Sequence, residues 1–362
     1  MLSTRQSQIL DLFLDEPNEA LSAGDLLPQF NIGRTSLFRD LTVLTEAGLI
    51  AASDGSTRSR TYRLHPNSDE YIRWDLSRPP QQRHEVNYQP ELLISYQPNQ
   101  SYLLTQEQRE LMAEVGEISN DQALEQDSKN YHRLIASLLI DLAHASSSLE
   151  NVPISWLDTK TLIEFGERPD GLNDTELKIV LNHKKAITHL TDNAATMSIA
   201  PKDLFDLHTL IADGLIPEVT AVGRLRQRVV RFSDSRYLPP ANPHLLRDAF
   251  ELFCEKADAI ENPFEQAFFA MSFLPYLQPF QDGNKRTSRL TMNIPLLKSQ
   301  LAPFSFSDMK KRDYMIGLLA FYERGKHRFL ADAFVRSYQK TAPCYAELLD
   351  CVQQGGALGS LT

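Results

Sequence analysis

Residues 277–290, LQPFQDGNKRTSRL, combine a glycine-containing loop with a helix rich in cations. The helix is expected to begin just after Gly283, and it carries three cations: Lys285, Arg286 and Arg289. Free backbone N–H groups at a helix N-terminus, aided by the helix dipole, form an anion site. Guanidinium groups three residues apart share one helical face. The pattern therefore predicts a cradle for a polyphosphate, and Asp282 is placed to hold a hard cation such as Mg²⁺ against those phosphates.

This stretch resembles the signature of the Fic (Fido) family, which reads His-Pro-Phe-x-Asp/Glu-Gly-Asn-Gly/Lys-Arg-x-x-Arg. Eight positions match in order: Pro279, Phe280, Asp282, Gly283, Asn284, Lys285, Arg286 and Arg289. Similarity upstream, in LHTLIADGL, in Gly223-Arg224-Leu225-Arg226 and in SRYLPPANP, extends the resemblance over about residues 104–341. It implies an all-α core that binds ATP or another adenine nucleotide, and most members of the family transfer AMP to a hydroxyl group.

The resemblance also implies roles for the motif residues. Four of them would line the nucleotide phosphates: Gly283, Asn284, Lys285 and Arg286. Arg289 would meet the terminal phosphate, Asp282 would bind the Mg²⁺ ion, and Phe280 would anchor the loop in the core. The alternative is a charged helix face whose arginines make surface ion pairs.

Gln278 occupies the position of the family's catalytic histidine. That histidine accepts a proton from the target hydroxyl, which then attacks a nucleotide phosphate. A primary amide has no nitrogen that titrates near pH 7, so it cannot act as a general base, and losing such a base typically costs about 10²- to 10⁴-fold in rate. The sequence thus predicts an inactive or very slow transferase. Lys285 is a second departure, because glycine is commonest there and a lysine in the related Doc branch accompanies transfer of phosphate alone.

Residues 146–151, SSSLEN, end a long predicted amphipathic helix and resemble the family's inhibitory motif, Ser/Thr-x-x-x-Glu-Gly/Asn. The three fixed positions are Ser146, Glu150 and Asn151. A carboxylate brought onto the cradle would pair with Arg289 and exclude a terminal phosphate. The alternative is a polar helix end with Glu150 in solvent.

Residues 222–239 are rich in β-branched and aromatic side chains before Pro239-Pro240, which predicts a hairpin between helices. By resemblance this hairpin is a flap that docks a protein target through backbone pairing. The candidate docking residues are Val229, Val230, Arg231, Phe232 and Tyr237. The alternative is a plain hairpin that covers the pocket.

The first 65 residues predict a winged helix-turn-helix, with helices at 4–14, 22–27 and 34–47 and strands at 49–52 and 60–64. The candidate DNA-binding residues are Arg34, Thr35, Ser36 and Arg39 in the third helix and Arg58 and Arg60 in the wing. Six arginines face eight acidic residues over 1–65, a net charge of −2, but five face three between 33 and 63. Double-stranded DNA and a docked protein are both open as partners.

The remaining chain is expected to be mainly α. We expect a winged helix-turn-helix domain at 1–65, a linker packed on its neighbours at 66–103, an all-α Fic core with a β-hairpin flap at 104–341, and a C-terminal tail at 342–362. The net charge of −10 excludes a protein that coats nucleic acid. No apolar run reaches the roughly 18 residues that span a bilayer, and the N-terminus lacks signal-peptide blocks, so a cytoplasmic protein without a membrane partner is expected.

These patterns together predict a nucleotide-responsive, DNA-binding regulator whose Fic core binds an adenine nucleotide with little turnover. One rival is a slow protein AMP-transferase or phosphotransferase that Glu150 autoinhibits. Another is a pure interaction module that captures a partner through the flap. A homodimer, the target, the operator and the preferred nucleotide all stay open.

Overall fold

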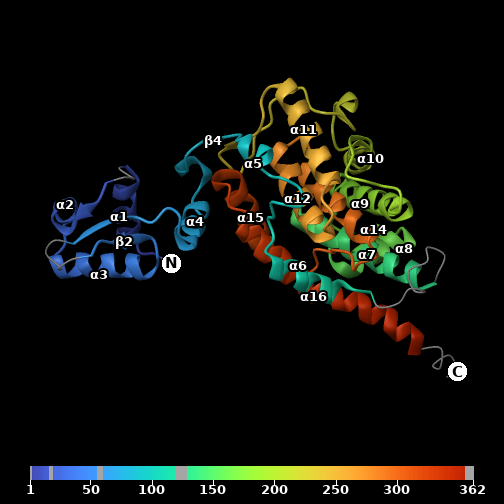
Figure 1. The fold of residues 1–362 in the computed structure, drawn as a ribbon, viewed down its shortest axis with the longest axis horizontal. Helices are drawn as coiled ribbons and strands as arrows, with labels where there is room; N and C mark the ends of the chain where they lie inside the picture. The colour runs from blue at the N-terminus through green and yellow to red at the C-terminus, as the bar shows by residue number, and fades with distance from the viewer. Residues whose placement is uncertain (1, 16–18, 55–59, 119–128, 355–362) are drawn as a thin grey trace. The chain divides into compact units, whose positions relative to one another are not determined.

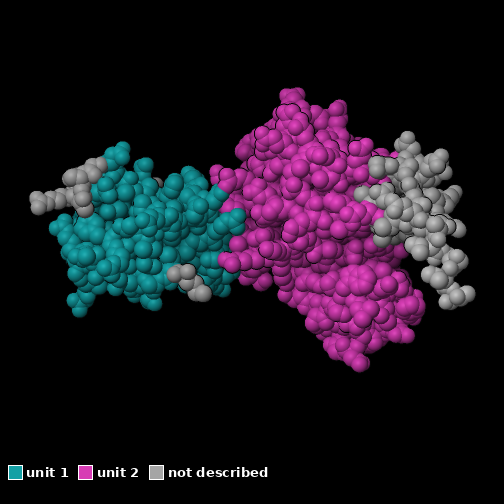
Figure 2. Space-filling view, turned by 90° about the horizontal axis from the view of Figure 1, so that it is seen from below, with its two compact units in different colours: residues 1–84 teal, residues 85–362 magenta. Residues whose placement is uncertain are grey.

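The computed structural model describes residues 2–15, 19–54, 60–118 and 129–354. The chain forms two compact units, Met1–His84 and Glu85–Thr362 (Figure 2). Two features of the expected wing, Gly55 and the candidate DNA contact Arg58, lie outside the described residues. Among the described helices, none has both the length and the apolar character that crossing a membrane requires.

The first unit contains three helices and a small antiparallel sheet whose strand order is β1-β3-β2. Its elements are α1 (Thr4–Asp15), β1 (Leu21–Ser22), α2 (Ala23–Leu26), a 3₁₀ turn (Leu27–Gln29), α3 (Arg34–Glu46), β2 (Ile50–Ala52) and β3 (Thr61–Leu64). Ser22 begins α2 with a capping box shared with Asp25. Leu37, Leu41 and Leu44 recur at helical spacing on α3 and are fully buried against α1. The three helices and two strands that the sequence predicted occur in the predicted order, and the structure adds β1 and the 3₁₀ turn between them.

The first unit extends to His84, beyond the boundary expected at residue 65. Residues predicted as linker form α4 (Asp69–Leu76) and a 3₁₀ turn (Pro80–Gln82). Ser68 caps α4 by accepting from the Tyr71 N–H group (3.1 Å) and donates to the carbonyl of Gly48. Tyr71 joins the core of the first unit. The proline-rich flanks hid this short amphipathic helix from a search for periodicity.

The second unit is helical, which confirms the mainly α expectation. Its elements are β4 (Val86–Asn87), α5 (Glu91–Ile94), α6 (Gln106–Gly116), α7 (Lys129–Leu149), α8 (Trp156–Phe165), α9 (Asp174–Asn193), α10 (Pro201–Ala212), a 3₁₀ turn (Val219–Ala221), β5 (Tyr237–Leu238), α11 (Pro243–Asp258), α12 (Pro263–Leu277), α13 (Asn284–Thr291), α14 (Asn293–Lys298), α15 (Lys311–Arg324) and α16 (Arg328–Gln354). Figure 1 shows α12 enclosed by other helices, with α16 running beside α6.

Helix α12 is apolar on all sides, and every residue from Ala267 to Leu277 is buried. A helix without a polar face belongs in the centre of a core. It packs against α6, α11, α13, α14 and α15, so the loop that leaves its C-terminus starts from a rigid support. This loop is the motif identified in the sequence.

Two expectations for the second unit were wrong. Residues 222–239 form no hairpin: within them the only strand is β5, and it pairs in parallel with β4. Tyr237 is 1% exposed and joins the core, which ties the segment inward instead of leaving two strands to pair with each other. The tail predicted from residue 342 also fails, because α16 continues to Gln354 with Ala342 and Tyr345 buried.

Candidate nucleotide-binding site

The loop between α12 and α13 is bracketed by two residues in the left-handed conformation. Gln278 has φ 49° and ends α12 by donating its N–H to the Leu274 carbonyl. Gly283 has φ 79° and begins α13. Glycine adopts this conformation without steric cost, whereas a residue with a Cβ atom would be strained at this φ even though that atom would meet Ile211 only at an ordinary contact distance of 3.4 Å. The glycine of the motif is therefore required by the turn itself.

Phe280 anchors the loop, as expected. Its side chain is fully buried and stacks on the ring of His208, with centroids 3.8 Å apart. The His208 ring also joins two backbones, because Nδ1 accepts from the N–H group of Gly223 (2.9 Å) and Nε2 donates to the carbonyl of Asp282 (2.9 Å). Burial lowers the pKa of His208 to about 4, so the ring is neutral at pH 7. The sequence analysis did not single out this histidine.

The side chain of Asn284 holds the loop rather than lining an open site. Its Oδ1 atom accepts from the Phe280 N–H group (2.8 Å), and its Nδ2 atom donates to the Phe280 carbonyl (2.9 Å) and to Oε1 of Gln278 (2.9 Å). The side chain of Asn284 is therefore engaged within the loop. Only its backbone N–H group is left for an anion.

Gln278 is built into the same network. Its Nε2 atom donates to the Pro275 carbonyl (2.8 Å), while its Oε1 atom accepts from Asn284. Its backbone carbonyl accepts from the buried guanidinium of Arg226 (2.6 Å), which also donates to Pro240 (2.6 Å). Both polar ends of the Gln278 amide thus brace the turn, and the side chain is 9% exposed.

The start of α13 has no side-chain cap, because its N-cap residue is Gly283. The first N–H groups of a helix have no intrahelical acceptor, so they are available to an anion here. Lys285 is half-buried beside them, and Arg286 is 5% exposed. Arg286 pairs with the Asp282 carboxylate (3.0 Å), whose side chain is 64% exposed at the mouth of the turn. The described cations near this helix start therefore exceed the acids.

Arg289 is fully buried one turn further along α13. Its Nε atom donates to the Ser146 hydroxyl (2.8 Å), and its Nη2 atom donates to Oε1 of Glu150 (2.7 Å). Its Nη1 atom has no hydrogen-bond partner among the described residues. The pairing of Glu150 with Arg289 that the sequence analysis expected is therefore present, and one guanidinium donor beside it is unused.

The chain turn at the end of α7 aims Glu150 at this arginine. The N–H groups of Asn151 and Val152 donate to the carbonyls of Ser148 and Ser147 (both 3.1 Å), and Asn151 has φ 68°. This is a Schellman motif in which Glu150 is the C-cap residue. Asparagine tolerates the left-handed conformation better than most residues, which explains the residue type at 151.

Glu150 is ionised at neutral pH. Burial by itself would raise the pKa of Glu150, but Arg289, Lys285 and Arg286 together lower it to about 2. On the other side of Ser146 lies His183, whose Nε2 atom is 2.7 Å from the Ser146 hydroxyl. Burial and the charge of Arg289 lower the pKa of His183 to about 3, so a neutral ring supports Ser146. This histidine also escaped the sequence analysis.

The remaining predicted residues are spread over the two units. In the flap segment, Val229 is 58% exposed and Arg231 is exposed, whereas Phe232 packs on Tyr237 and Tyr322. The buried Tyr237 cannot contact a docked target, which corrects that assignment. In the first unit, the exposed candidates on α3 are Arg34, Thr35 and Arg39; Ser36 is half-buried there, and Arg60 is half-buried on the approach to β3.

A family model described as the Fic/DOC family matches residues 198–296, from α10 to α14. The chain contains a Fic/DOC domain. A protein adenylyltransferase Fic from Nematostella vectensis is 27% identical over 187 residues, covering 50% of this chain and 43% of that protein. One from Culex quinquefasciatus is 25% identical over 226 residues, covering 59% and 45%. This chain therefore matches less than half the length of these relatives.

Solved structures of Fic proteins share much of the fold of this chain. Residues 134–508 of Fic-1 from C. elegans align with a TM-score of 0.54 at 18% identity, covering 71% of each chain. A Fic family protein from Desulfovibrio desulfuricans aligns with a TM-score of 0.52 at 20% identity, covering 74% of this chain and 79% of that one. At these identities the likeness concerns the fold alone.

Replacing Glu150 by Gln should make the stability of the second unit less dependent on pH. The folded pKa of Glu150, about 2, lies below its ordinary value of 4.5, so its ionisation stabilises the fold above pH 4.5 and that contribution is lost as the pH falls toward 2. We expect Glu150→Gln to lower the free energy of unfolding at pH 7 by about 1 to 3 kcal/mol, because a charge-assisted bond to a buried arginine is lost.

Urea unfolding measured from pH 7 down to pH 3 checks this expectation. The difference between the wild type and Glu150→Gln should shrink as the pH falls. The matched control is Glu164→Gln, at an exposed glutamate on α8, which should follow the wild type throughout. If Glu150→Gln lowers the free energy of unfolding by the same amount at every pH, the ion pair between Glu150 and Arg289 is contradicted.

Proposed function

We propose that the Fic/DOC domain binds an adenine nucleotide at the start of α13 with little turnover, and that occupancy regulates DNA binding by the first unit. The observation that carries the proposal is the state of Arg289. One donor of this buried guanidinium is unused among the described residues, and another is held by Glu150. A terminal phosphate and the Glu150 carboxylate would compete for the same cation.

The nucleotide would lie with its phosphates over the uncapped helix start. The backbone N–H groups of Asn284, Lys285 and Arg286 would bind them, and the side chain of Lys285 would add charge. Arg289 would take the terminal phosphate once Glu150 moves aside. Glu150 should therefore weaken the binding of nucleoside triphosphates strongly. It should have little effect on the binding of AMP, which lacks that phosphate.

Asp282 fits the requirement for a Mg²⁺ ligand in such a complex. Its carboxylate is largely exposed, and Mg²⁺ commonly binds through one or two carboxylates together with substrate phosphates and water. No group of three or more His, Cys, Asp or Glu side chains in the described parts of the chain could hold a metal ion. Asp282 would therefore share the ion with the phosphates, and the ion would neutralise part of their charge.

Slow transfer follows from the state of Gln278. In an AMP transfer, the target oxygen forms a bond to the α-phosphorus, the bond to pyrophosphate breaks, and the hydroxyl proton must go to a base. Gln278 has no titratable nitrogen, and both polar atoms of its amide are engaged with Pro275 and Asn284. Binding without efficient chemistry is the expected result.

A second candidate is a slow protein AMP-transferase or phosphotransferase that Glu150 holds in check. It is supported by the curated relatives, which are described as protein adenylyltransferases. A target segment would then lie against the flap segment near the exposed Val229 and Arg231 and the half-buried Val230. Replacing Gln278 by histidine distinguishes this slow transferase from the nucleotide-responsive regulator proposed first.

Contacts within the second unit connect the motif to the chain that follows the first unit. β4 begins two residues after His84 and pairs with β5, which ends the flap segment. The N–H group of Gln89 donates to the hydroxyl of Tyr276 (2.9 Å), two residues before Gln278. A change at the motif loop can therefore reach the chain segment that joins the two units.

Calorimetry with Mg²⁺ should show that Glu150→Gln binds ATP at least about fivefold more tightly than the wild type, the low end of usual coupling energies. AMP affinity should change little, because no phosphate of AMP reaches Arg289. Lys285→Ala should weaken both nucleotides. The absence of any binding below millimolar in both the wild type and Glu150→Gln would rule out the nucleotide site.

Labelled ATP should show whether the missing base alone limits transfer. We expect Glu150→Gly/Gln278→His to incorporate label from α-labelled ATP about 10²- to 10⁴-fold faster than Glu150→Gly. Histidine tolerates the left-handed conformation required at 278. Glu150→Gly/Gln278→Ala is the matched control and should stay slow. Label only from γ-labelled ATP would indicate phosphate transfer, and brisk labelling by the unaltered chain would favour the second candidate.

DNA binding is tested with a pool of random-sequence duplexes, from which tight binders are selected. Arg34→Ala/Arg39→Ala should weaken binding and reduce its salt dependence by about two phosphate contacts, because both guanidinium groups are exposed on α3. ATP should change the affinity of the wild type but not that of Lys285→Ala. A chain that selects no duplex with or without ATP is not a DNA-binding regulator.

A further inference from the structure

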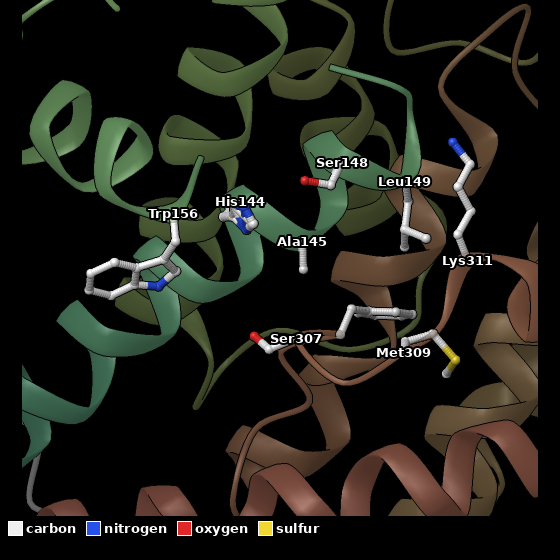
Figure 3. Close-up of a pocket in the computed structure, with 9 residues that line it drawn as sticks. His144, Ala145, Ser148, Leu149, Trp156, Ser307, Met309 and Lys311 are labelled. Atoms are coloured by element: carbon white, nitrogen blue, oxygen red, sulfur yellow. The ribbon is translucent and has the colours of Figure 1, made fainter. Parts of the chain in front are cut away.

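A cavity of about 260 Å³ lies beside the C-terminal end of α7 (Figure 3). Its apolar lining comes from Ala145 and Leu149 of α7 and from Phe306 and Met309, which precede α15. The indole ring of Trp156 forms another part of its wall. The indole N–H group donates to Asp141 (2.7 Å), which holds the ring in place. The cavity therefore has a fixed apolar wall next to the segment that presents Glu150.

The polar lining of the cavity favours an anion. Lys311 supplies a cation, His144 supplies an imidazole ring, Ser148 and Ser307 supply hydroxyl groups, and no carboxylate is among the described residues that line it. Its volume falls just below the usual range for drug-sized ligands, which points to a small occupant. An apolar body with one negative group fits such a site, because the body replaces water on the wall and the charge meets Lys311.

The cavity and the Arg289 contact lie on neighbouring faces of one helix end. Ala145, Ser148 and Leu149 line the cavity, while Ser146 and Glu150 reach Arg289. Residues that line the cavity and residues that contact Arg289 are interleaved along this short segment. A shift of the segment therefore changes the cavity and the Arg289 contact together.

Lys311 connects the cavity to the residue after Glu150. Its ammonium group donates to the side-chain carbonyl of Asn151, the left-handed residue of the Schellman motif. An anion in the cavity would compete with Asn151 for Lys311. Losing that bond loosens the turn that aims Glu150.

We propose that this cavity binds a small aromatic carboxylate, and that binding draws Lys311 away from Asn151 and so releases Glu150 from Arg289. Binding of the carboxylate in the cavity does not depend on the function proposed above. The consequence for nucleotides rests on the function proposed above, in which Glu150 competes with a terminal phosphate. A cell could thereby couple the nucleotide site to an organic acid that never touches it.

Benzoate is the probe, and benzamide is its uncharged match of nearly the same shape. Binding is measured on the full chain without nucleotide, by saturation-transfer NMR and titration. We expect benzoate to bind at least about tenfold more tightly than benzamide, and we expect Lys311→Gln to remove that difference. Lys310→Gln, at an exposed neighbour that does not line the cavity, should keep it. Ser148→Leu should fill the cavity from α7 and weaken both probes.

Amide hydrogen exchange tests the release step, also without nucleotide. Saturating benzoate should speed exchange at Asn151 and Val152, whose N–H groups close the turn, by about fivefold or more, and Ser148→Leu should abolish the effect. Equal binding of benzoate and benzamide, or wild-type binding by Ser148→Leu, would overturn the site. If benzoate slows exchange at these amides or leaves it unchanged, the proposed release of Glu150 from Arg289 is wrong.

ATP affinity with and without benzoate then links the cavity to the nucleotide site. Benzoate should tighten ATP binding in the wild type and have no effect in Glu150→Gln, which has no carboxylate to release. If benzoate binds and speeds exchange but Glu150→Gln binds ATP no better than the wild type, the competition proposed under the previous heading fails while the cavity and the release stand.

Discussion

A fully buried guanidinium at Arg289 sets the conditions for the whole site. A charge removed from water is strongly destabilising unless other groups in the fold compensate it. Two groups from the end of α7 do so: the Ser146 hydroxyl and the Glu150 carboxylate. The same cation is the natural partner of a nucleotide's terminal phosphate in the proposed complex. In that proposal Arg289 pairs either with Glu150 or with a ligand phosphate, but not with both. The residues around Arg289 set the balance between the two states.

The loop before α13 is held by hydrogen bonds from the neutral side chains of His208, Asn284 and Gln278 and from the buried guanidinium of Arg226. His208 joins two backbone segments, Asn284 closes the turn from inside, and the Gln278 amide links Asn284 to the Pro275 carbonyl. In the Fic/DOC domain, residue 278 thus serves the architecture of the turn. This side chain braces the loop with both polar atoms, leaves the start of α13 without a side-chain cap, and supplies no nitrogen that titrates near pH 7. This separation of binding from chemistry underlies the regulator hypothesis.

Long-range contacts account for the expectations that were wrong. The proposed hairpin at residues 222–239 had the right residue types, but Tyr237 packs on Tyr276 and β5 pairs with β4, a strand about 150 residues earlier. β-Propensity describes how a residue fits a half-buried pleated surface, and it does not name the partner strand. The boundary at residue 65 failed for a similar reason. Tyr71 belongs to the core of the first unit, and nothing local in a proline-rich stretch reveals that.

The sequence by itself determined what depends on neighbours along the chain. The glycine at the left-handed position 283, the cations spaced along α13, the absence of a base at 278 and the helical periods of α3 and α7 are all local properties of residue type and spacing. Tertiary structure decided which of these groups meet. Glu150 contacts Arg289 across 139 positions, and His183, His208 and Arg226 became supports of the site only because burial removed their access to water. A contact over such a separation depends on how whole helices pack, and that packing is set by the summed burial of many side chains rather than by any short run of residues.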